Sequence, residues 1–249
     1  MELLSAEQRF QRLARYATRS IRPILGPSKR RKAEKATIEI CEYVLELVEK
    51  RRVVPEDDMI SDLLAASEGD PKVTTDDIVR VVGGLVSAGT GTTSVACARA
   101  LRSLFLHPDQ LTLLREDRSL LSNAIGELLR YDSGLIVMPR YPREDFVLHG
   151  RHIEKGQLVA LSMMGANRDP RVFPDPDRLD LCRNTRMSLS FGHGHHYCVG
   201  TNIAQLEMHL MLDALLDILP PGARLVEDEI RWSTRGLMSQ IGSLPVDFG

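Results

Sequence analysis

The chain has 249 residues, of which 43% are hydrophobic and 27% are charged, and its formal net charge is −2. A chain of this length and composition can bury a sizeable core, in one large domain or two small ones. The near-neutral charge gives no general basis for nucleic-acid binding, and no apolar run approaches the ~20 residues that a membrane span needs. The N-terminus lacks the order of a secretory signal, and the 4 cysteines are too widely spaced for a disulfide framework, so we expect a soluble cytoplasmic protein.

The N-terminal segment is strongly basic. The first 35 residues contain ten Lys or Arg and three Glu, a local charge of +7 that leaves −9 for the remainder. The apolar residues with helix-like spacing are Leu3, Leu4, Phe10, Leu13, Ala17 and Ile21. They predict a basic amphipathic helix that ends near Pro23 and Gly26. We assign residues 1–32 to this segment and residues 33–249 to the main domain. Its basic face suits a membrane surface, a partner protein or solvent.

Further helices are predicted as far as residue 131. Residues 32–52 have one apolar face, which we expect to be buried. Its members are Ile38, Cys41, Val44, Leu45 and Val48. A short helix should begin at Pro55, and a long helix over residues 74–107 should begin with a Thr cap and two Asp in its first turn. The long helix is apolar nearly all round and, at about 1.5 Å per residue, would cross the domain through its centre. Residues 109–117 and 119–131 form a further helix pair.

The pattern changes after residue 132. Residues 145–161 hold strand-like runs separated by His149-Gly150 and Lys155-Gly156 turns. Residues 167–183 are rich in proline and read as an extended connection. The last strong helix covers residues 199–219, and the tail beyond it reads as loops and short strands. The expected fold class is therefore mainly α with a small β component (α+β).

The glycines of the long helix need an explanation, because each interior glycine costs ~1 kcal/mol relative to alanine. They are Gly83, Gly84, Gly89 and Gly91. A phosphate-binding loop would need the Walker lysine or the third glycine of a dinucleotide fingerprint, and both are missing. Small-residue packing against a neighbouring helix would explain Gly83 and Gly84. A third explanation is the close approach of a flat ligand, or a local distortion that lets Thr92 present its hydroxyl to a pocket.

The sequence FGHGHHYCVG, residues 191–200, immediately precedes the last helix. Cys198 stands at the beginning of that helix, where the helix dipole and free N–H groups favour a thiolate. The loop glycines allow tight turns and the close approach of a bulky planar group. They are Gly192, Gly194 and Gly200. The nominal ligands for a tetrahedral zinc ion are His193, His195, His196 and Cys198. Adjacent histidines point apart, so we rank zinc below a single thiolate ligand to an iron macrocycle.

This motif resembles the cysteine-ligand loop of the cytochrome P-450 haem-thiolate family. FGHGHHYCVG matches the family's pattern at every fixed position. Three weaker motifs precede this loop in the chain and occur in the family's order. AGTGTTS resembles the oxygen-binding segment of the central helix, ELLR resembles the ExxR pair, and NRDPRVFPDPDRLDLCR resembles the meander before the cysteine loop. The resemblance implies the C-terminal part of the P-450 fold, with a long central helix and a Cys-ligand loop, and without a substantial N-terminal part of the family domain.

The resemblance also implies roles around the cofactor, which would be haem b. Cys198 resembles the axial iron ligand, and Phe191 resembles the aromatic residue that shields the sulfur. His196 and Arg140 resemble the groups that bind the haem propionates through charge-assisted hydrogen bonds. The loop glycines, Gly192, Gly194 and Gly200, would fit the loop against the porphyrin.

On the long helix, Thr92 resembles the threonine that helps deliver protons to dioxygen. Ala88 and Gly89 would border the distal face of the haem. A structural network resembling that of the family would consist of Glu127, Arg130 and Arg178.

Two departures from the family pattern bear on function. Gly91 stands where the family usually places Asp or Glu before the threonine, so proton delivery must use another group or water, unless the protein uses peroxide or does not activate oxygen. The missing N-terminal part would leave one haem face poorly covered, and exposed apolar surface of that kind indicates a partner.

The resemblance therefore implies a haem-thiolate monooxygenase that inserts one oxygen atom from dioxygen into a small apolar or natural-product substrate. A ferredoxin or a flavoprotein would supply the electrons. The alternatives are a peroxide-driven enzyme, and a non-catalytic or haem-binding accessory protein that needs a second chain to complete its fold.

Overall fold

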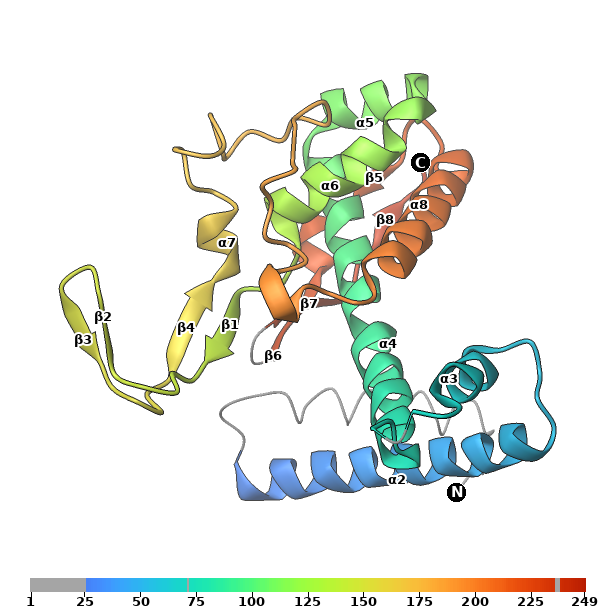
Figure 1. Cartoon of the computed structure of the whole chain (residues 1–249). Helices are drawn as coiled ribbons and strands as arrows, with labels where there is room; N and C mark the ends of the chain where they lie inside the picture. Colours follow the sequence, from blue (N-terminus) through green and yellow to red (C-terminus); the bar gives the residue numbers. More distant parts are fainter. Residues whose placement is uncertain (1–25, 71, 236–237) are drawn as a thin grey trace. The chain divides into compact units, whose positions relative to one another are not determined.

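The computed structural model describes residues 26–249, apart from residues 71, 236 and 237 (Figure 1). The chain divides into two compact units, one that ends at Thr92 and one from Thr93 to Gly249. The basic helix predicted before Gly26 lies outside the described residues. The predicted domain boundary after residue 32 falls inside the continuous helix α2 (Pro27–Val53).

In the first unit, α2 packs against α3 (Met59–Ser67) and the first part of α4 (Thr75–Leu106). The residues of this core are Ile40, Val44, Val48, Ile60, Ile78, Val79 and Val82. The predicted face of α2 was wrong at Ile38 and Leu45, which are 57% and 43% exposed. These two residues are seven apart and form a second apolar row, which spacing alone does not distinguish from the buried one.

Helix α3 begins at Met59, not at Pro55 as predicted, because Asp58 is its N-cap. The Asp58 carboxylate accepts the backbone N–H of Ser61 at 2.9 Å and forms an ion pair with Arg51. The Ser61 hydrogen bond, and then the Arg51 guanidinium, hold the pKa of Asp58 at about 2. A carboxylate cap is favoured at this helix end by the helix dipole as well.

Helix α4 is the long helix that the sequence predicts, and it is continuous over its 32 residues. Its start is a reciprocal cap, in which Thr74 Oγ1 accepts the N–H of Asp77 and the Asp77 carboxylate accepts the N–H of Thr74. Contrary to the expectation that no apolar run suits a membrane span, an 18-residue window of α4 has a mean hydropathy of 1.3, so the helix is long and apolar enough for one by length and composition alone. Core helices share that property, and the second half of α4 carries buried Ala100 and Leu104.

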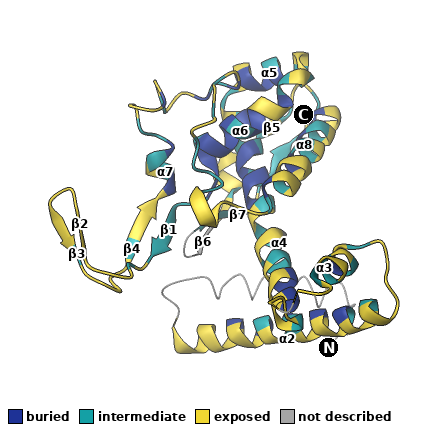
Figure 2. Ribbon diagram, viewed as in Figure 1, coloured by how far each residue is buried: buried dark blue, intermediate teal, exposed yellow. Residues whose placement is uncertain are grey.

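In the second unit, the core lies among the second half of α4, α5 (Pro108–Glu116), α6 (Leu121–Asp132) and α8 (Thr201–Ile218). Figure 2 shows buried residues along α6, whose apolar side chains form one face. The fully buried members of this core include Leu104, Leu114, Leu128, Leu181 and Leu212. A short 3-10 turn, η2 (Arg118–Leu120), joins α5 to α6.

The strands of the second unit pair antiparallel in twos. The pairs are β1 (Val137–Arg140) with β4 (Val159–Ser162), β2 (Phe146–Leu148) with β3 (Arg151–Ile153), β5 (Arg224–Leu225) with β8 (Val246–Asp247), and β6 (Arg231–Arg235) with β7 (Met238–Ser243). The predicted turn between β2 and β3 is confirmed, with φ values of 48° at His149 and 76° at Gly150. The remaining short elements are α7 (Met163–Ala166), η3 (Gly194–His196) and η4 (Glu227–Glu229). A mainly α fold with a small β component is confirmed.

Polar contacts fasten α4 to α6 and to β7. The Arg99 guanidinium donates to the buried Asp132 carboxylate at 2.7 Å and to the carbonyl oxygen of Ser239 at 3.1 Å. The guanidinium groups of Arg99 and Arg102 each lie 5.3 Å from the ring centroid of Trp232. Trp232 is therefore packed beside α4 within the second unit.

Candidate cysteine-ligand site

The cysteine loop is closed by its own backbone hydrogen bonds. The N–H of Cys198 donates to the carbonyl oxygen of Phe191 at 2.9 Å, and the N–H of Tyr197 donates to that of Gly194 at 2.9 Å. Gly192 and Gly194 have φ values of 78° and 69°, in the left-handed region that side chains rarely adopt. The two glycines therefore let the chain turn back so that both bonds form.

The Cys198 thiol is exposed at the end of this loop. The carbonyl oxygen of Cys198 accepts the hydroxyl of Thr201 at 2.7 Å, and Gly200 is the N-cap residue of α8. A Cβ atom at Gly200 would lie 3.9 Å from the Cys198 sulfur, which is ordinary contact. The backbone around Cys198 is thus bonded on both sides while its sulfur stays accessible.

The loop does not assemble a multi-ligand metal centre. Among the described residues, which include the whole loop, no group of three or more His, Cys, Asp or Glu side chains could hold a metal ion. A tetrahedral zinc site needs four such ligands. As folded, the loop does not bring such a set of ligands together, and the role of Cys198 as the single ligand of an iron macrocycle stays a prediction.

The other loop and strand residues singled out by the sequence lie as follows. Phe191 is half-buried and packs against the core of the second unit. His196 ends η3 and is exposed. Arg140 ends β1, and its guanidinium donates to the carbonyl oxygen of Pro139 at 2.9 Å. Within the described residues no hydrogen bond or ion pair joins Arg140 to His196, so their shared role toward haem propionates stays a prediction.

The candidate oxygen-binding residues belong to the first unit. Ala88, Gly89 and Thr92 are all exposed on α4. The Thr92 hydroxyl donates to the carbonyl oxygen of Ala88 at 2.8 Å, one turn earlier. Helix α4 continues through Thr92 without interruption, and the local distortion considered for Thr92 stays a prediction.

The glycines of α4 do not share one explanation. A Cβ atom at Gly83 would lie 3.6 Å from the side chains of Cys41 and Ile40, so Gly83 packs closely against α2. No such neighbour is found for Gly84 among the described residues, because a Cβ atom there would meet none of them within 4 Å. The Cβ positions of Gly89 and Gly91 are also open toward the described residues.

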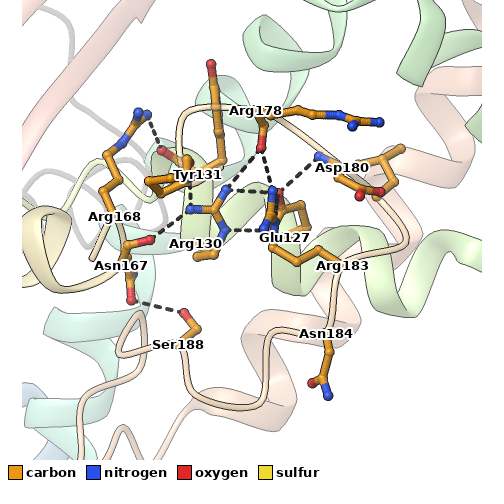
Figure 3. Close-up of polar contacts among 12 residues, drawn as sticks. Glu127, Arg130, Tyr131, Asn167, Arg168, Arg178, Asp180, Arg183, Asn184 and Ser188 are labelled. Atoms are coloured by element: carbon orange, nitrogen blue, oxygen red, sulfur yellow. Dashed lines mark hydrogen bonds and ion pairs between the residues drawn. The ribbon is translucent and has the colours of Figure 1, made fainter. Parts of the chain in front are cut away.

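Glu127 and Arg130 form a fully buried ion pair on α6 (Figure 3). The guanidinium donates to both carboxylate oxygens, at 2.6 and 2.9 Å, which is the bidentate geometry that makes such pairs strong. The remaining Arg130 nitrogen donates to the carbonyl oxygens of Asn167 at 2.8 Å and Pro176 at 2.9 Å. The pair thus gathers segments that lie far apart in the sequence.

The arginine that joins this pair is Arg183, not Arg178 as predicted. The Arg183 guanidinium donates to Glu127 at 3.1 Å, and its side chain is 11% exposed. Arg178 is exposed and contributes its carbonyl oxygen, which accepts from both Arg130 and Arg183. The backbone N–H of Asp180 also donates to Glu127, at 3.1 Å. One carboxylate oxygen therefore holds three donors from two chain segments.

Sequence reasoning missed two polar residues of the second unit. Arg183 lies in the same proline-rich connection as Arg178, and that connection has no periodicity that could tell the two arginines apart. Asn167 begins the NRDP motif and is 1% exposed, although an isolated asparagine in a loop is usually at the surface. A polar residue at the start of an otherwise matched motif is the signal that could have drawn attention to it.

A single accessible cysteine on a glycine-bearing loop, backed by a buried Glu-Arg-Arg network, is the arrangement of the haem-thiolate class of proteins. The family model for Cytochrome P450 matches residues 2–218. The chain therefore belongs to the cytochrome P450 family.

The chain is 33% identical over 248 residues to 6-deoxyerythronolide B hydroxylase of Saccharopolyspora erythraea, covering 98% of this chain and 61% of that protein. It is 37% identical over 206 residues to the biotin biosynthesis cytochrome P450 of Bacillus subtilis, covering 83% and 52%. The crystal structure of P450BioI in complex with an acyl carrier protein ligated to hexadec-9Z-enoic acid superposes with a TM-score of 0.89 at 32% identity, covering 99% of this chain and 63% of that one.

The chain spans between half and two thirds of the length of these relatives. Membership of the family implies haem as the cofactor.

Proposed function

We propose that this chain carries the cysteine-ligand part of a haem-thiolate monooxygenase. The observation that carries the proposal is the loop around Cys198, whose sulfur is exposed while its backbone is fixed by bonds to Phe191 and Thr201. Bound through that sulfur, haem would supply the activation of dioxygen for the insertion of one oxygen atom into the substrate. Family membership supports the same reaction class.

The residues of the chain would hold the cofactor in three ways. The Cys198 thiolate would be the iron ligand, and Phe191 would keep water from the sulfur. The Gly192 and Gly194 turns leave no side chain between the loop backbone and a flat ring. His196 and Arg140 would donate to the propionate carboxylates, since both carry N–H groups suited to carboxylate oxygens.

Thr92 is the proposed proton relay. Its hydroxyl donates to Ala88 at 2.8 Å, which leaves its lone pairs free to accept from water or another donor. Gly91 provides no carboxylic acid beside it, so the proton must reach Thr92 Oγ1 from water or from another group. The open Cβ position of Gly91 makes Gly91→Asp sterically possible. Higher oxygen-dependent turnover in Gly91→Asp would support the monooxygenase, and turnover with hydrogen peroxide and no redox partner would support the peroxide-driven alternative.

The substrate is proposed to be a small apolar molecule or a natural product. This follows the name of one relative, 6-deoxyerythronolide B hydroxylase, and the fatty-acyl carrier protein bound in the P450BioI structure. We further propose a ferredoxin or a flavoprotein as the electron donor, and a cytoplasmic location. The form of the cofactor is proposed to be haem b.

The decisive experiment is the carbon monoxide spectrum. The chain is loaded with haem, reduced and exposed to carbon monoxide, beside Cys198→Ser and the control Cys182→Ser, which changes another exposed cysteine of the same unit. We expect the thiolate-type Soret band in the unchanged chain and in Cys182→Ser, and its loss in Cys198→Ser. Absence of that band from the unchanged chain, or its survival in Cys198→Ser, would contradict the proposal.

A second candidate is an accessory chain that works only with a polypeptide completing the fold. One face of α8 favours it, because Ile203, Leu206 and Leu210 are 62%, 59% and 61% exposed. These residues lie on the side opposite buried Met208 and Leu212. A helical polypeptide supplying the part of the family fold that the relatives have in addition would cover this stripe. Turnover by the chain alone with a redox system, abolished in Cys198→Ser, would count against this candidate.

A further inference from the structure

Asn167 is a buried polar residue attached directly to the Glu127–Arg130 pair. It is the C-cap residue of α7, and its N–H donates to the carbonyl oxygen of Met163 at 3.0 Å. Its own carbonyl oxygen accepts the Arg130 guanidinium at 2.8 Å. The backbone of Asn167 is therefore fixed through both its N–H and its carbonyl oxygen, independently of its side chain.

The Asn167 side chain holds three consecutive residues ahead of the cysteine loop. Its Oδ1 accepts the backbone N–H of Leu189 at 2.7 Å and the hydroxyl of Ser188 at 3.4 Å (Figure 3). Its Nδ2 donates to the hydroxyl of Ser190 at 2.9 Å. The two serine hydroxyls also bond each other at 2.8 Å. A buried amide is costly unless its hydrogen bonds are made, and here they fix the register of residues 188–190.

The hydrogen bonds continue from this segment to the cysteine. The carbonyl oxygen of Leu189 accepts the N–H of Gly192 at 2.9 Å, where the loop makes its first left-handed turn. The carbonyl oxygen of Phe191, the next residue along the chain after Ser190, accepts the N–H of Cys198 at 2.9 Å. Asn167 thus fixes the chain directly before Phe191, whose carbonyl oxygen makes one of the two closing bonds of the loop.

We propose that Asn167 is a positioning residue that sets the height and direction of the Cys198 loop relative to the buried Glu127–Arg130 pair. This role deepens the proposed function, and its consequence for haem binding rests on that function. Its structural content, the coupling of residue 167 to residues 188–198, does not depend on haem. The coupling runs through one amide that can neither ionise nor reach a second arrangement while all three partners stay bonded.

The test uses the haem-free chain and hydrogen exchange followed by mass spectrometry. Asn167→Leu is nearly isosteric but makes no hydrogen bond, and Ser190→Ala is a milder variant that removes one partner. The matched control is Asn184→Leu, which changes an exposed asparagine whose side chain accepts the N–H of Arg186. We expect peptides over residues 188–199 to exchange roughly tenfold faster in Asn167→Leu, the effect of about one lost net hydrogen bond, and less so in Ser190→Ala. Asn184→Leu should leave these peptides unchanged.

The haem-loaded chain provides the second readout. Asn167→Leu should convert a larger share of the reduced carbon monoxide complex to the form without a thiolate ligand, whereas Asn167→Asp, which keeps both acceptor contacts, should restore part of it. Unchanged exchange over residues 188–199 in both Asn167→Leu and Ser190→Ala would overturn the proposal, as would an equal change in Asn184→Leu. If the unchanged chain shows no thiolate band, the proposed function fails, while the exchange experiment still decides the role of Asn167.

Discussion

Arg183→Met tests which arginine completes the Glu127 network, with Arg178→Met as its matched control. Methionine keeps an unbranched apolar stem and removes the guanidinium group. The Arg183 side chain is 11% exposed and its guanidinium lies 3.1 Å from a carboxylate that is fully buried. The Arg178 side chain is exposed, and only its carbonyl oxygen, which the substitution leaves in place, belongs to the network.

The size of the effect follows from these contacts. A lost hydrogen bond to a charged group costs ~1.5–3 kcal/mol. Arg183 also donates to the carbonyl oxygens of Pro174, Asp175 and Arg178, which water can satisfy in part. Because Arg130 still neutralises the buried carboxylate, the loss should stay below the upper part of the ~3–5 kcal/mol range for an orphaned buried charge. We therefore expect Arg183→Met to lower the free energy of unfolding by about 2–4 kcal/mol, and Arg178→Met by less than ~0.5 kcal/mol.

Urea unfolding followed by tryptophan fluorescence measures this difference. The chain has one tryptophan, Trp232, which lies in the same compact unit as Glu127, so its emission reports on the unit that contains the network. Far-UV circular dichroism without urea shows whether each variant is folded at the start. Equal unfolding midpoints for the two variants, or a larger loss in Arg178→Met, would refute the assignment of Arg183.

Three further outcomes are expected. Gly134→Ala should lower the free energy of unfolding by at least ~2 kcal/mol, because the φ of Gly134 is 77° and a Cβ atom there would lie 2.7 Å from the Arg99 side chain of α4. Gly150→Ala, with a φ of 76° and open space around its Cβ position, measures the backbone cost alone, about 1 kcal/mol. Equal losses in the two variants would exclude the clash. Burial raises the pKa of Cys97 to about 11, so iodoacetamide at pH 8 should label exposed Cys198 and not Cys97, as detected by mass spectrometry. Labelling of both cysteines would contradict the burial of Cys97. The pKa of Asp58 is lowered from 3.8 to about 2, so the contribution of this carboxylate to stability is fully present above pH 3.8 and is lost as the pH falls toward 2. An NMR titration of the Asp58 carboxyl group measures this pKa, and a value near 4 would contradict the prediction.

The helices could be predicted because their signals are local. The 3.6-residue period and the cap at Thr74 predict α4 almost to its ends, and the left-handed pair His149 and Gly150 forms the turn expected between β2 and β3. The buried face of α2 was predicted only in part, since Ile38 and Leu45 belong to a row with the same spacing as the buried one. Which of two rows is buried is decided by what packs on the helix, and that information lies outside the helix.

The long-range network is a different case. Glu127 and Arg183 are separated by 56 positions, and the connection between them has no period that would direct one arginine inward and another outward. Tertiary packing decides the matter, because the carboxylate is buried and only a guanidinium that reaches it can offset its desolvation. Asn167 escaped prediction for the same reason, since its three side-chain partners lie between 21 and 23 positions away.

The cysteine loop stands between these two cases, and this explains why its motif is so informative. Its closing bonds join residues only seven positions apart or fewer, such as Cys198 and Phe191, and the glycines that permit them lie within the same ten residues. The local geometry is therefore encoded where it occurs and can be read from the sequence. What ten residues do not encode is the orientation of the finished loop, which depends on Asn167 and through it on the Glu127–Arg130 pair. A sequence that kept the motif but lacked Asn167 and the Glu127–Arg130 pair would keep the hydrogen bonds within the loop. The position of the cysteine sulfur would no longer be fixed by those contacts.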